Sequence, residues 1–321
     1  MSRIAIIGAG IAGLACARQL AQVGVSVVVF DKGRGIGGRV ATRRAGDLQF
    51  DHGAPYVTAK RDDFVACLRS LTGSGHAASW TDDMGDTWAV GSPSMSAIPE
   101  GMGAGLEVRL GTHISKVHTD EAGWHLHYGE TEYIATHVVV TVPKPQVAGL
   151  LGCAHPLVAQ TADVKMEPGL TLMTAVNGNA PSFTTERSDD QLAFIACDSR
   201  KPNRPLNEGT SWVAQAGIEF SLTHLEKNLP DIAALMLPLL CKRLDVTLDR
   251  ITHAVAHRWR YSRVSTALGQ PFLCTPNRSL YLGGDWCVGA HIEDAWTSGT
   301  AIAQDLLEGG GDEGCKDCAA V

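Results

Sequence analysis

Short apolar runs and amphipathic stretches alternate along the chain, and this pattern predicts a mixed α/β fold. Residues 4–7 and 26–30 are apolar and rich in β-branched side chains, as is typical of strands buried on both faces. A helical spacing of apolar residues begins after Gly10, between these two runs. Further buried strands are predicted at 138–142 and in "SLYLGGDW" at 279–286. Elements of one parallel sheet therefore occur near both ends of the chain.

The stretches between these runs show the alternation of half-buried strands or the spacing of helices. The alternating pattern predicts strands at 106–110, 113–119, 124–128, 170–176, 192–197, 211–216 and 251–259. The helical pattern predicts helices at 61–71, 231–244 and 294–307, the last of them capped at its start. A second domain is therefore inserted between the sheet elements. This order favours a flavin fold over a nicotinamide dehydrogenase, whose nucleotide domain is usually one continuous piece.

The turn between the first strand and the first helix is glycine-rich. Gly8 permits the tight turn, Gly10 lets the backbone approach a pyrophosphate, and Gly13 allows the helix to pack closely on the strand. The helix start, with Ile11 and Ala12, then faces the phosphates with unpaired N–H groups and partial positive charge. The strand before the turn and the helix after it make this a specific prediction of dinucleotide binding.

A second glycine-rich stretch, "DKGRGIGGRVATRR", starts where the second strand ends. Asp31 lies at the spacing from which a carboxylate binds an adenosine ribose. Gly38 and its neighbouring glycines let the backbone lie close to a ligand, and Arg39 suits bidentate phosphate recognition. Arg43 and Arg44 either help to bind phosphate or are solvated surface charges. With the following "DHGAPYVTA", this stretch resembles the flavin amine oxidase superfamily, whose second fingerprint ends in Gly-Gly-Arg.

A third stretch, "YLGGDWCVGAHIEDAWTSGTAIAQDL", resembles the C-terminal motif of such flavoproteins. The resemblance implies that Asp285, after Gly284, binds the ribityl–phosphate region of the flavin. It also implies that the backbone of Ile292, Glu293 and Asp294 points at the pyrimidine ring. Reduced flavin carries negative charge there, which a helix N-terminus stabilises. The alternative roles are a turn residue for the first aspartate and a helix cap for the last.

Several stretches narrow the resemblance to the renalase family, particularly its bacterial members. They are "FDKGRGIGGRVATRR", "DHGAPYVTA", "VGSPSMSAIPEGM", "VKMEP", "HRWRYSR" and "LGGDWCVGAHIEDAWTSG". Membership implies oxidation of NAD(P)H isomers reduced at ring position 2 or 6. Hydride passes from the ring to flavin N5, NAD(P) leaves, and dioxygen reoxidises the flavin to give hydrogen peroxide. This chemistry requires neither a protein nucleophile nor a metal.

We predict that FAD is held noncovalently, because no Cys or His lies in a recognised attachment motif. Besides the residues named above, the implied FAD-binding set comprises Lys32, Arg34, His52, Gly53, Ala54, Val117 and Thr141.

The dihydronicotinamide ring requires a flat slot that holds it about 3–3.5 Å from the flavin. Packing is an alternative role for Tyr56, and a satisfied turn residue is one for His291. The stretch 257–259 either faces the substrate or packs in the core. Lys165 does not match the lysine that many flavin amine oxidases hold near flavin N5, so it receives no catalytic role. The predicted slot residues are His52, Tyr56, Trp286 and His291, with Trp296 nearby.

Composition limits the remaining classes of partner. The chain has 321 residues, 45% of them hydrophobic and 19% charged, with a net charge of −7, so we expect a globular protein with no nucleic-acid partner. No apolar run reaches the roughly 18 residues of a membrane span, and a strand at Arg3 leaves no room for a secretory signal. Nine cysteines, an odd number, favour reduced thiols and a cytoplasmic location.

We therefore predict an α/β protein with a Rossmann-like FAD-binding domain of the glutathione reductase or amine oxidase type and an inserted α+β substrate domain. The FAD-binding domain comprises 1–60, 100–150 and 275–310, the substrate domain comprises 61–99 and 151–274, and 311–321 form a flexible tail. The tail contains a CxxC at Cys315 and Cys318.

Three alternatives to a dihydro-NAD(P) oxidase remain open at this stage. They are a flavin amine oxidase or desaturase acting on a small amine or apolar substrate, a redox-sensing module that uses the CxxC, and a nicotinamide-dependent dehydrogenase. The sequence leaves open the preferred isomer, the choice between NAD and NADP, and the oligomeric state.

Overall fold

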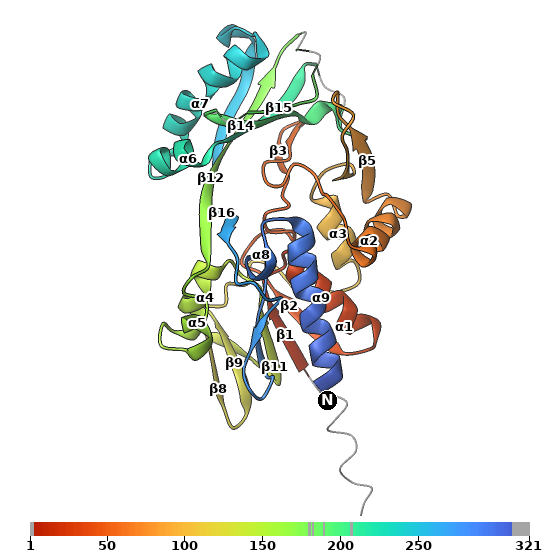
Figure 1. The fold of residues 1–321 in the computed structure, drawn as a ribbon, viewed down its shortest axis with the longest axis vertical. Coiled ribbons are helices and arrows are strands. Elements are labelled where there is room, and N and C mark those ends of the chain that lie inside the picture. Colours follow the sequence, from red (N-terminus) through yellow and green to blue (C-terminus); the bar gives the residue numbers. More distant parts are fainter. Residues whose placement is uncertain (1–2, 179–180, 182, 189, 206–207, 310–321) are drawn as a thin grey trace, which may run out of the picture. The chain divides into compact units, whose positions relative to one another are not determined.

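The computed structural model describes residues 3–178, 181, 183–188, 190–205 and 208–309, and it divides the chain into two compact units (Figure 1). Unit 1 comprises Met1–Gly38, Met102–Lys165 and Val264–Val321. Unit 2 comprises Arg39–Gly101 and Met166–Arg263. The tail at 311–321, with its CxxC, lies outside the described residues. Within the described part of the chain, no helix is long and apolar enough to cross a bilayer.

Unit 1 contains a six-stranded sheet in the order β17-β18-β11-β1-β2-β7. All neighbouring strands in it are parallel except β17, which runs antiparallel to β18. Its strands are β1 (Arg3–Ile7), β2 (Ser26–Phe30), β7 (Glu107–Arg109), β11 (His137–Val140), β17 (Leu273–Cys274) and β18 (Leu280–Leu282). The apolar runs form these strands because both of their faces are covered. Four residues of β1 and three each of β2 and β11 are buried.

Helices and a small antiparallel sheet complete unit 1. The sheet has the order β10-β9-β8, from β8 (Lys116–Asp120), β9 (Gly123–Tyr128) and β10 (Thr131–Ala135). The helices are α1 (Ile11–Gln22), α4 (Lys144–Leu151), α5 (Pro156–Ala159), α8 (Asp285–Val288) and α9 (Ile292–Gly309). A Cβ on Gly299 of α9 would lie 2.1 Å from the Ala12 carbonyl oxygen of α1, so the two helices pack at a distance that only glycine allows (Figure 1).

Unit 2 is built on a five-stranded sheet in the order β13-β14-β15-β12-β16. Its strands are β12 (Lys165–Val176), β13 (Thr185–Arg187), β14 (Leu192–Cys197), β15 (Thr210–Ala216) and β16 (Ile251–Thr266). Two hairpins, β3 (Arg43–Ala45) with β4 (Leu48–Phe50) and β5 (Ala77–Thr81) with β6 (Thr87–Gly91), belong to the same unit. The remaining elements are α2 (Asp62–Gly73), α3 (Ala97–Gly103), which ends at the unit boundary, α6 (Ile218–His224), α7 (Leu229–Leu244) and the 3-10 turns Asp198–Arg200 and Leu248–Arg250.

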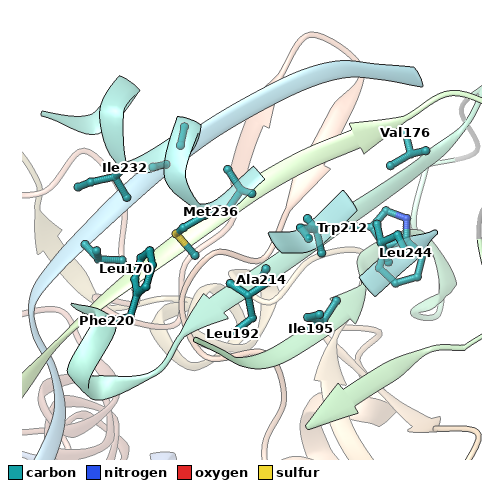
Figure 2. Packing of buried hydrophobic residues seen from close by; sticks show 14 of the residues in the cluster. Leu170, Val176, Leu192, Ile195, Trp212, Ala214, Phe220, Ile232, Met236 and Leu244 are labelled. Atoms are coloured by element: carbon teal, nitrogen blue, oxygen red, sulfur yellow. The ribbon is translucent and has the colours of Figure 1, made fainter. Parts of the chain in front are cut away.

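The two faces of the unit 2 sheet have different partners. One face packs against α6 and α7 in an apolar core that includes Trp212, Phe220 and Met236 (Figure 2). The other face contributes Met173, Ala175 and Val213 to a smaller apolar cluster. Phe50 of β4 completes this cluster. Neighbouring residues of β16 follow the same alternation, since Ala256 is in the first core and Val255 packs against the second cluster.

The predicted fold class is confirmed, and most predicted elements are present within a few residues of their bounds. Helix α9 begins at Ile292, two residues before the predicted start, because Asp294 does not precede the helix. Its carboxylate instead reaches back to accept the His291 backbone N–H at 2.8 Å. The β5–β6 hairpin and the short helices α3 to α6 were missing from the prediction.

Candidate flavin site

The glycine turn after β1 has the geometry that a pyrophosphate requires. Gly8 has φ +113°, and a Cβ on it would lie 2.7 Å from the Thr141 hydroxyl. A Cβ on Gly13 would lie 2.0 Å from the Gly8 carbonyl oxygen, so a side chain there would separate helix from strand. Gly10 differs, since a Cβ on it would meet no atom within 4 Å. Its open side lies at the start of α1, where Gly10 is the N-cap and provides no side-chain capping bond.

The Asp31 carboxylate is fixed beside this turn. One of its oxygens accepts the Ala9 N–H at 2.7 Å, and the other accepts the Gly33 N–H at 2.6 Å. A carboxylate has about four lone-pair sites, so both oxygens can still accept hydroxyl protons of a ribose. The adjacent Gly37 N–H donates to the Ala9 carbonyl at 2.7 Å, which holds the second glycine-rich stretch against the first.

The other predicted cofactor residues of unit 1 fall into two groups. Lys32, Arg34 and Gly38 are exposed along the second glycine-rich stretch. Val117 is buried in β8, and the Thr141 hydroxyl donates to the carbonyls of the glycine turn. Thr141 therefore supports the turn, Val117 is a core residue of its strand, and the three exposed residues are the ones accessible to a ligand.

In the C-terminal motif, Gly284 has φ +142° and its N–H donates to the Ser298 hydroxyl at 2.9 Å. Asp285 follows as a buried residue at the start of α8. Trp286 has no exposed surface, and its indole N–H donates to the Val142 carbonyl at 3.1 Å. This burial argues for packing of the Trp286 side chain rather than for contact with a substrate.

The start of α9 is the accessible part of this motif. His291 is exposed, and its Nδ1 lies 3.1 Å from the Asp294 carboxylate. Glu293 lies beside it in the first turn and is half-buried. Asp294, a residue of the first turn, thus stabilises the helix start by accepting a backbone N–H that precedes the helix. The backbone groups of that turn can still face a ligand.

Unit 2 holds the remaining predicted residues in the segment 51–56 and joins them to Arg39. The Ala54 N–H donates to the Arg39 carbonyl at 2.9 Å, and a Cβ on Gly53 would lie 1.9 Å from that oxygen. The guanidinium of Arg39 donates to the Ser262 carbonyl at 3.1 Å. Gly53 is therefore required by the close approach of two backbones, and its own carbonyl accepts the Gln215 amide at 2.7 Å.

The His52 ring lies among aromatic side chains of β16. It stacks on Trp259 with ring centroids 5.3 Å apart and meets His257 edge-on at 4.7 Å. The Trp259 indole N–H donates to the His52 carbonyl at 2.9 Å. Burial, followed by the nearby charges of His257 and Arg43, lowers the pKa of His52 to about 4. The ring is therefore neutral at pH 7, and burial also lowers the pKa of His257.

One atom of this group points to a bound molecule. Nδ1 of His52 is buried and has no hydrogen-bond partner among the described residues. Leaving a buried polar atom unpaired costs about 1–3 kcal/mol, so native structures usually provide a partner. A ligand that hydrogen-bonds to Nδ1 would remove that cost.

Tyr56 belongs to a second aromatic group. It stacks on Trp88 with ring centroids 4.4 Å apart and meets Phe194 edge-on at 5.9 Å. The Arg187 guanidinium lies over all three rings, 4.8 Å from the centroid of Trp88. Tyr56 is only half-buried, so this arrangement combines packing with a surface that a ligand can reach.

A buried ionic cluster next to His52 was absent from the sequence prediction. Lys201 Nζ lies 2.9 Å from Asp51 Oδ2 and 2.6 Å from Asp198 Oδ1, and Arg204 Nη2 lies 2.6 Å from Asp51 Oδ2. Burial alone would raise the pKa of Asp51, but Lys201 and Arg204 hold that pKa well below its usual range. Burial, together with the charge of Asp51, raises the pKa of Asp198 to about 6 against the opposing effect of Lys201. We call these four residues the buried ionic cluster.

Comparisons with known proteins agree with this geometry. Residues 6–70 match the model of an NAD(P)-binding Rossmann-like domain, and residues 69–307 match the model of the flavin containing amine oxidoreductase family. The second match covers well over half of the chain. The chain belongs to the flavin-containing amine oxidoreductase family. This family consists of flavin-containing oxidoreductases, and membership supports FAD as the cofactor.

Individual proteins resemble the chain to different extents. A 4,4'-diapophytoene desaturase of Staphylococcus aureus is 38% identical over 68 residues, which are 20% of this chain and 14% of that protein. The match therefore spans about a seventh of the desaturase. A protoporphyrinogen oxidase candidate from Exiguobacterium sp. 255-15 has a TM-score of 0.76 at 14% identity, over 96% of this chain and 99% of that chain. Cyclohexylamine oxidase from Brevibacterium oxydans has a TM-score of 0.73 at 14% identity, over 95% and 99%.

The residues of this flavin oxidoreductase fit FAD on three structural grounds. Gly10 leaves open space at a helix N-terminus, Asp31 is fixed for a ribose, and His52 carries a buried atom without a partner in the described chain. When bound, FAD would supply the acceptor for one hydride, which carries two electrons. In unit 1, the backbone at Gly10 and the carboxylate of Asp31 would hold the phosphates and the ribose of the cofactor.

Two features of this family member could not be read from local sequence. Asp51 lies inside a recognised motif, but its partners Lys201 and Arg204 come from "DSRKPNRP", which has no helical or strand periodicity. Gln215 follows the alternation of a buried strand, where only its polarity marks it. A polar residue within an otherwise apolar strand was the one available signal. Lys165, which received no catalytic role, is exposed.

Proposed function

We propose that this protein is an FAD-dependent oxidase of 2- or 6-dihydro-NAD(P) that returns them to NAD(P) and reduces dioxygen to hydrogen peroxide. The observation that carries the proposal is the neutral aromatic surface formed by His52, His257 and Trp259. Their ring centroids lie 4.4 to 5.3 Å apart, with His52 stacked on Trp259 and His257 edge-on to both, so the rings hold one another in place. A dihydronicotinamide is a planar, uncharged hydride donor. It matches such a surface better than a protonated amine does.

The charge beside this surface supports the same substrate. The positive charge of Arg43 contributes to the lowered pKa values of His52, His253 and His257, so all three rings experience it. Arg43 pairs with Phe50 across the β3–β4 hairpin, and Phe50 stacks on His253 at 5.3 Å. A positive charge at this place attracts the pyrophosphate of a dinucleotide and repels an alkylammonium ion.

In this proposal the aromatic residues of unit 2 orient the substrate, and His52 forms a hydrogen bond. The surface of imidazole and indole rings orients the nicotinamide, which a hydride transfer requires within about 3–3.5 Å of its acceptor. Nδ1 of His52 is available to hydrogen-bond to the carboxamide of the substrate or to the cofactor. Because the pKa of His52 is about 4, this ring neither gains nor loses a proton near pH 7. Removal of a hydride from a dihydronicotinamide leaves no proton for the protein to accept.

The test is anaerobic absorbance of the bound flavin after mixing the holoenzyme with 2-, 4- or 6-dihydro-NAD, or with cyclohexylamine. Rapid bleaching by the 2- or 6-isomer, with little by ordinary NADH or the amine, is the expected result. Bleaching by the amine alone would overturn the proposal. The preferred isomer follows directly from the same rates.

Two neighbouring arginines give a matched pair of variants. Arg43→Gln removes the charge whose effect reaches the histidines, whereas Arg44→Gln removes an equally exposed charge from the next position of the strand, which points the other way. We expect Arg43→Gln to raise the apparent Kd of the dihydro-NAD isomer about fivefold, roughly 1 kcal/mol. Arg44→Gln should change it less than twofold. Equal effects of the two substitutions would remove the argument from charge.

Oxidation of an amine or desaturation of an apolar substrate is the second candidate function. The similarity in fold to cyclohexylamine oxidase and the local identity to a diapophytoene desaturase favour it. The amine arm of the absorbance experiment decides between the two. A cytoplasmic location and noncovalent FAD are part of the proposal, and release of all flavin from acid-precipitated protein tests the latter.

A further inference from the structure

The buried ionic cluster is almost completely shielded from solvent, and three ion pairs join its four side chains. The side chains of Asp51 and Lys201 have no exposed surface, and those of Asp198 and Arg204 are each 2% exposed. Two carboxylates and two cations balance each other in charge. Replacing such buried pairs by apolar residues is often neutral or stabilising, so stability alone is a weak reason for the cluster.

The cluster and its surroundings hold three consecutive residues of one backbone segment. At Asp51, the backbone N–H donates to the Asp198 carboxylate, and the side chain accepts from Lys201 and Arg204. At the next two positions, the His52 carbonyl accepts the Trp259 indole N–H and the Gly53 carbonyl accepts the Gln215 amide. The partner residue in each of these hydrogen bonds lies at least 147 positions later in the chain.

The same segment is also paired with the backbone of Arg39. Ala54 is hydrogen-bonded to Arg39, which follows Gly38 directly in the chain. The preceding residue, Gly37, is bridged to Gly10 of the glycine turn. The unpartnered Nδ1 atom of His52 lies in the middle of the held segment. Any displacement of Asp51 would therefore move that atom and the backbone that pairs with Arg39.

We propose that Lys201 and Arg204 are positioning residues, which hold the Asp51 carboxylate and thereby fix His52 and Gly53 against the bound flavin. Neither cation touches the cofactor in this account. They act through Asp51, in the same way that outer groups orient the ligands of a metal site. The inference rests on FAD as the cofactor and on the predicted contact of the 52–54 segment with it. It does not depend on which molecule donates the hydride.

The experiment therefore uses no hydride donor. Apoprotein is reconstituted with FAD, and three properties are measured: the Kd for FAD from quenching of flavin fluorescence, the visible spectrum, and the midpoint potential of the bound flavin. In Lys201→Met, Asp198 loses its cation and Asp51 keeps only Arg204, so Asp51 shifts. We expect a tenfold or greater rise in the Kd for FAD, an altered visible spectrum and a changed midpoint potential, because Lys201 no longer neutralises the contact between the two carboxyl groups.

The double variant Asp198→Asn with Lys201→Met is the first control. It restores one anion to one cation, since Asp51 keeps Arg204 at 2.6 Å, and the asparagine oxygen can still accept the Asp51 N–H. We expect its Kd for FAD to return to within threefold of wild type. Met236→Ala, which opens a cavity in the helix-covered core, is the control for stability. It should lower Tm as much as Lys201→Met does and leave the flavin spectrum and potential unchanged.

If Lys201→Met does not fold, Arg204→Lys provides the test, because it keeps the charge but cannot reach both Asp51 and the Gly91 carbonyl as the guanidinium does. It should raise the Kd for FAD threefold or more and alter the spectrum. The inference is wrong if the folded variant, like Met236→Ala, has a lower Tm but an unchanged flavin spectrum and midpoint potential. A protein that fails to oxidise any dihydro-NAD isomer, yet shows these flavin shifts, would refute the proposed function and leave this inference standing.

Discussion

The candidate site residues of unit 1 lie in a glycine-rich backbone turn, whereas those of unit 2 depend on contacts between side chains. In unit 1 the glycine turn and the carboxylate that holds it are 22 positions apart, and their geometry follows from one strand, one turn and one helix. In unit 2 Asp51 finds its partners 150 and 153 positions away. The glycine turn of unit 1 is sensitive to added side-chain atoms. The buried ionic cluster of unit 2 is sensitive to the removal of a charged group. Substitutions in the two units should therefore fail in different ways.

The largest effect is expected from Asp51→Ala in unit 2. It leaves Lys201 and Arg204 buried with Asp198 as their only anion, and removing one partner from a buried pair costs about 3–5 kcal/mol. Chemical denaturation of the apoprotein measures this loss. Glu226→Gln, which breaks the exposed pair with Arg260, is the control and should cost less than about 1 kcal/mol. Similar losses in the two variants would show that burial of the cluster has no energetic consequence.

In unit 1, Gly13→Ala should destabilise the protein by about 3 kcal/mol, since the new Cβ would lie 2.0 Å from a backbone oxygen that no side-chain movement can relieve. The same substitution at Gly149 in α4, where no atom lies within 4 Å, should instead stabilise by about 0.5–1 kcal/mol. Thermal unfolding of the two variants compares them directly. Equal signs would contradict the packing role of Gly13.

The neutral state of His52 predicts a pH dependence specific to unit 2. Its folded pKa of about 4 lies below the usual value near 6.5, so as the pH falls the unfolded state takes up the proton first. Stability is therefore lost between about pH 6.5 and pH 4. From pH 7 to pH 5 the loss from this group is about 2 kcal/mol.

Denaturation of wild type and His52→Gln at both pH values isolates this contribution. Wild type should lose about 2 kcal/mol more than the variant does. Parallel losses in the two proteins would mean that His52 is ionised in the folded state or reaches its usual pKa there.

The smallest effect on the fold, but a clear one on binding, is expected from Gly10→Ala. A Cβ there meets no protein atom, so Tm of the apoprotein should stay within a degree or two of wild type. The methyl group would occupy the space that a pyrophosphate needs, and the Kd for FAD should rise about tenfold, roughly 1.4 kcal/mol. Unchanged FAD affinity would show that the phosphates approach elsewhere.

The sequence was most informative where local pattern alone determines the structure. Uninterrupted apolar runs predicted the buried parallel strands, and the glycine spacing predicted the turn. In that turn Gly8 and Gly13 have no room for a side chain, whereas Gly10 faces open space. These are short-range constraints, so a window of about 20 residues contains them. The β5–β6 hairpin was missed because its turn residues, 82–86, are acidic and did not match a two-residue hairpin signal.

Long-range contacts explain what the sequence could not predict. Nothing near Lys201 indicates that it will meet Asp51, because that contact depends on how the sheet of unit 2 is closed by the segment 198–204. Trp286 was assigned to the slot from its position in a motif, while its burial depends on Val142, far earlier in the chain. Aromatic residues in a motif therefore need a measured exposure before a binding role is assigned to them.

Strand β16 has a consequence for engineering and divergence of this protein. His253, Val255, His257 and Trp259 pack on the side of Phe50 and His52, while Ala254 and Ala256 pack into the helix-covered core. Substituting one of the first set changes the recognition surface and spares the core. Inserting or deleting one residue would exchange the two sets. The imidazole rings would then face the leucines of the helix-covered core, and the alanines would face Phe50 and His52. Specificity can therefore drift along this strand by replacement, but the length of the strand must stay constant.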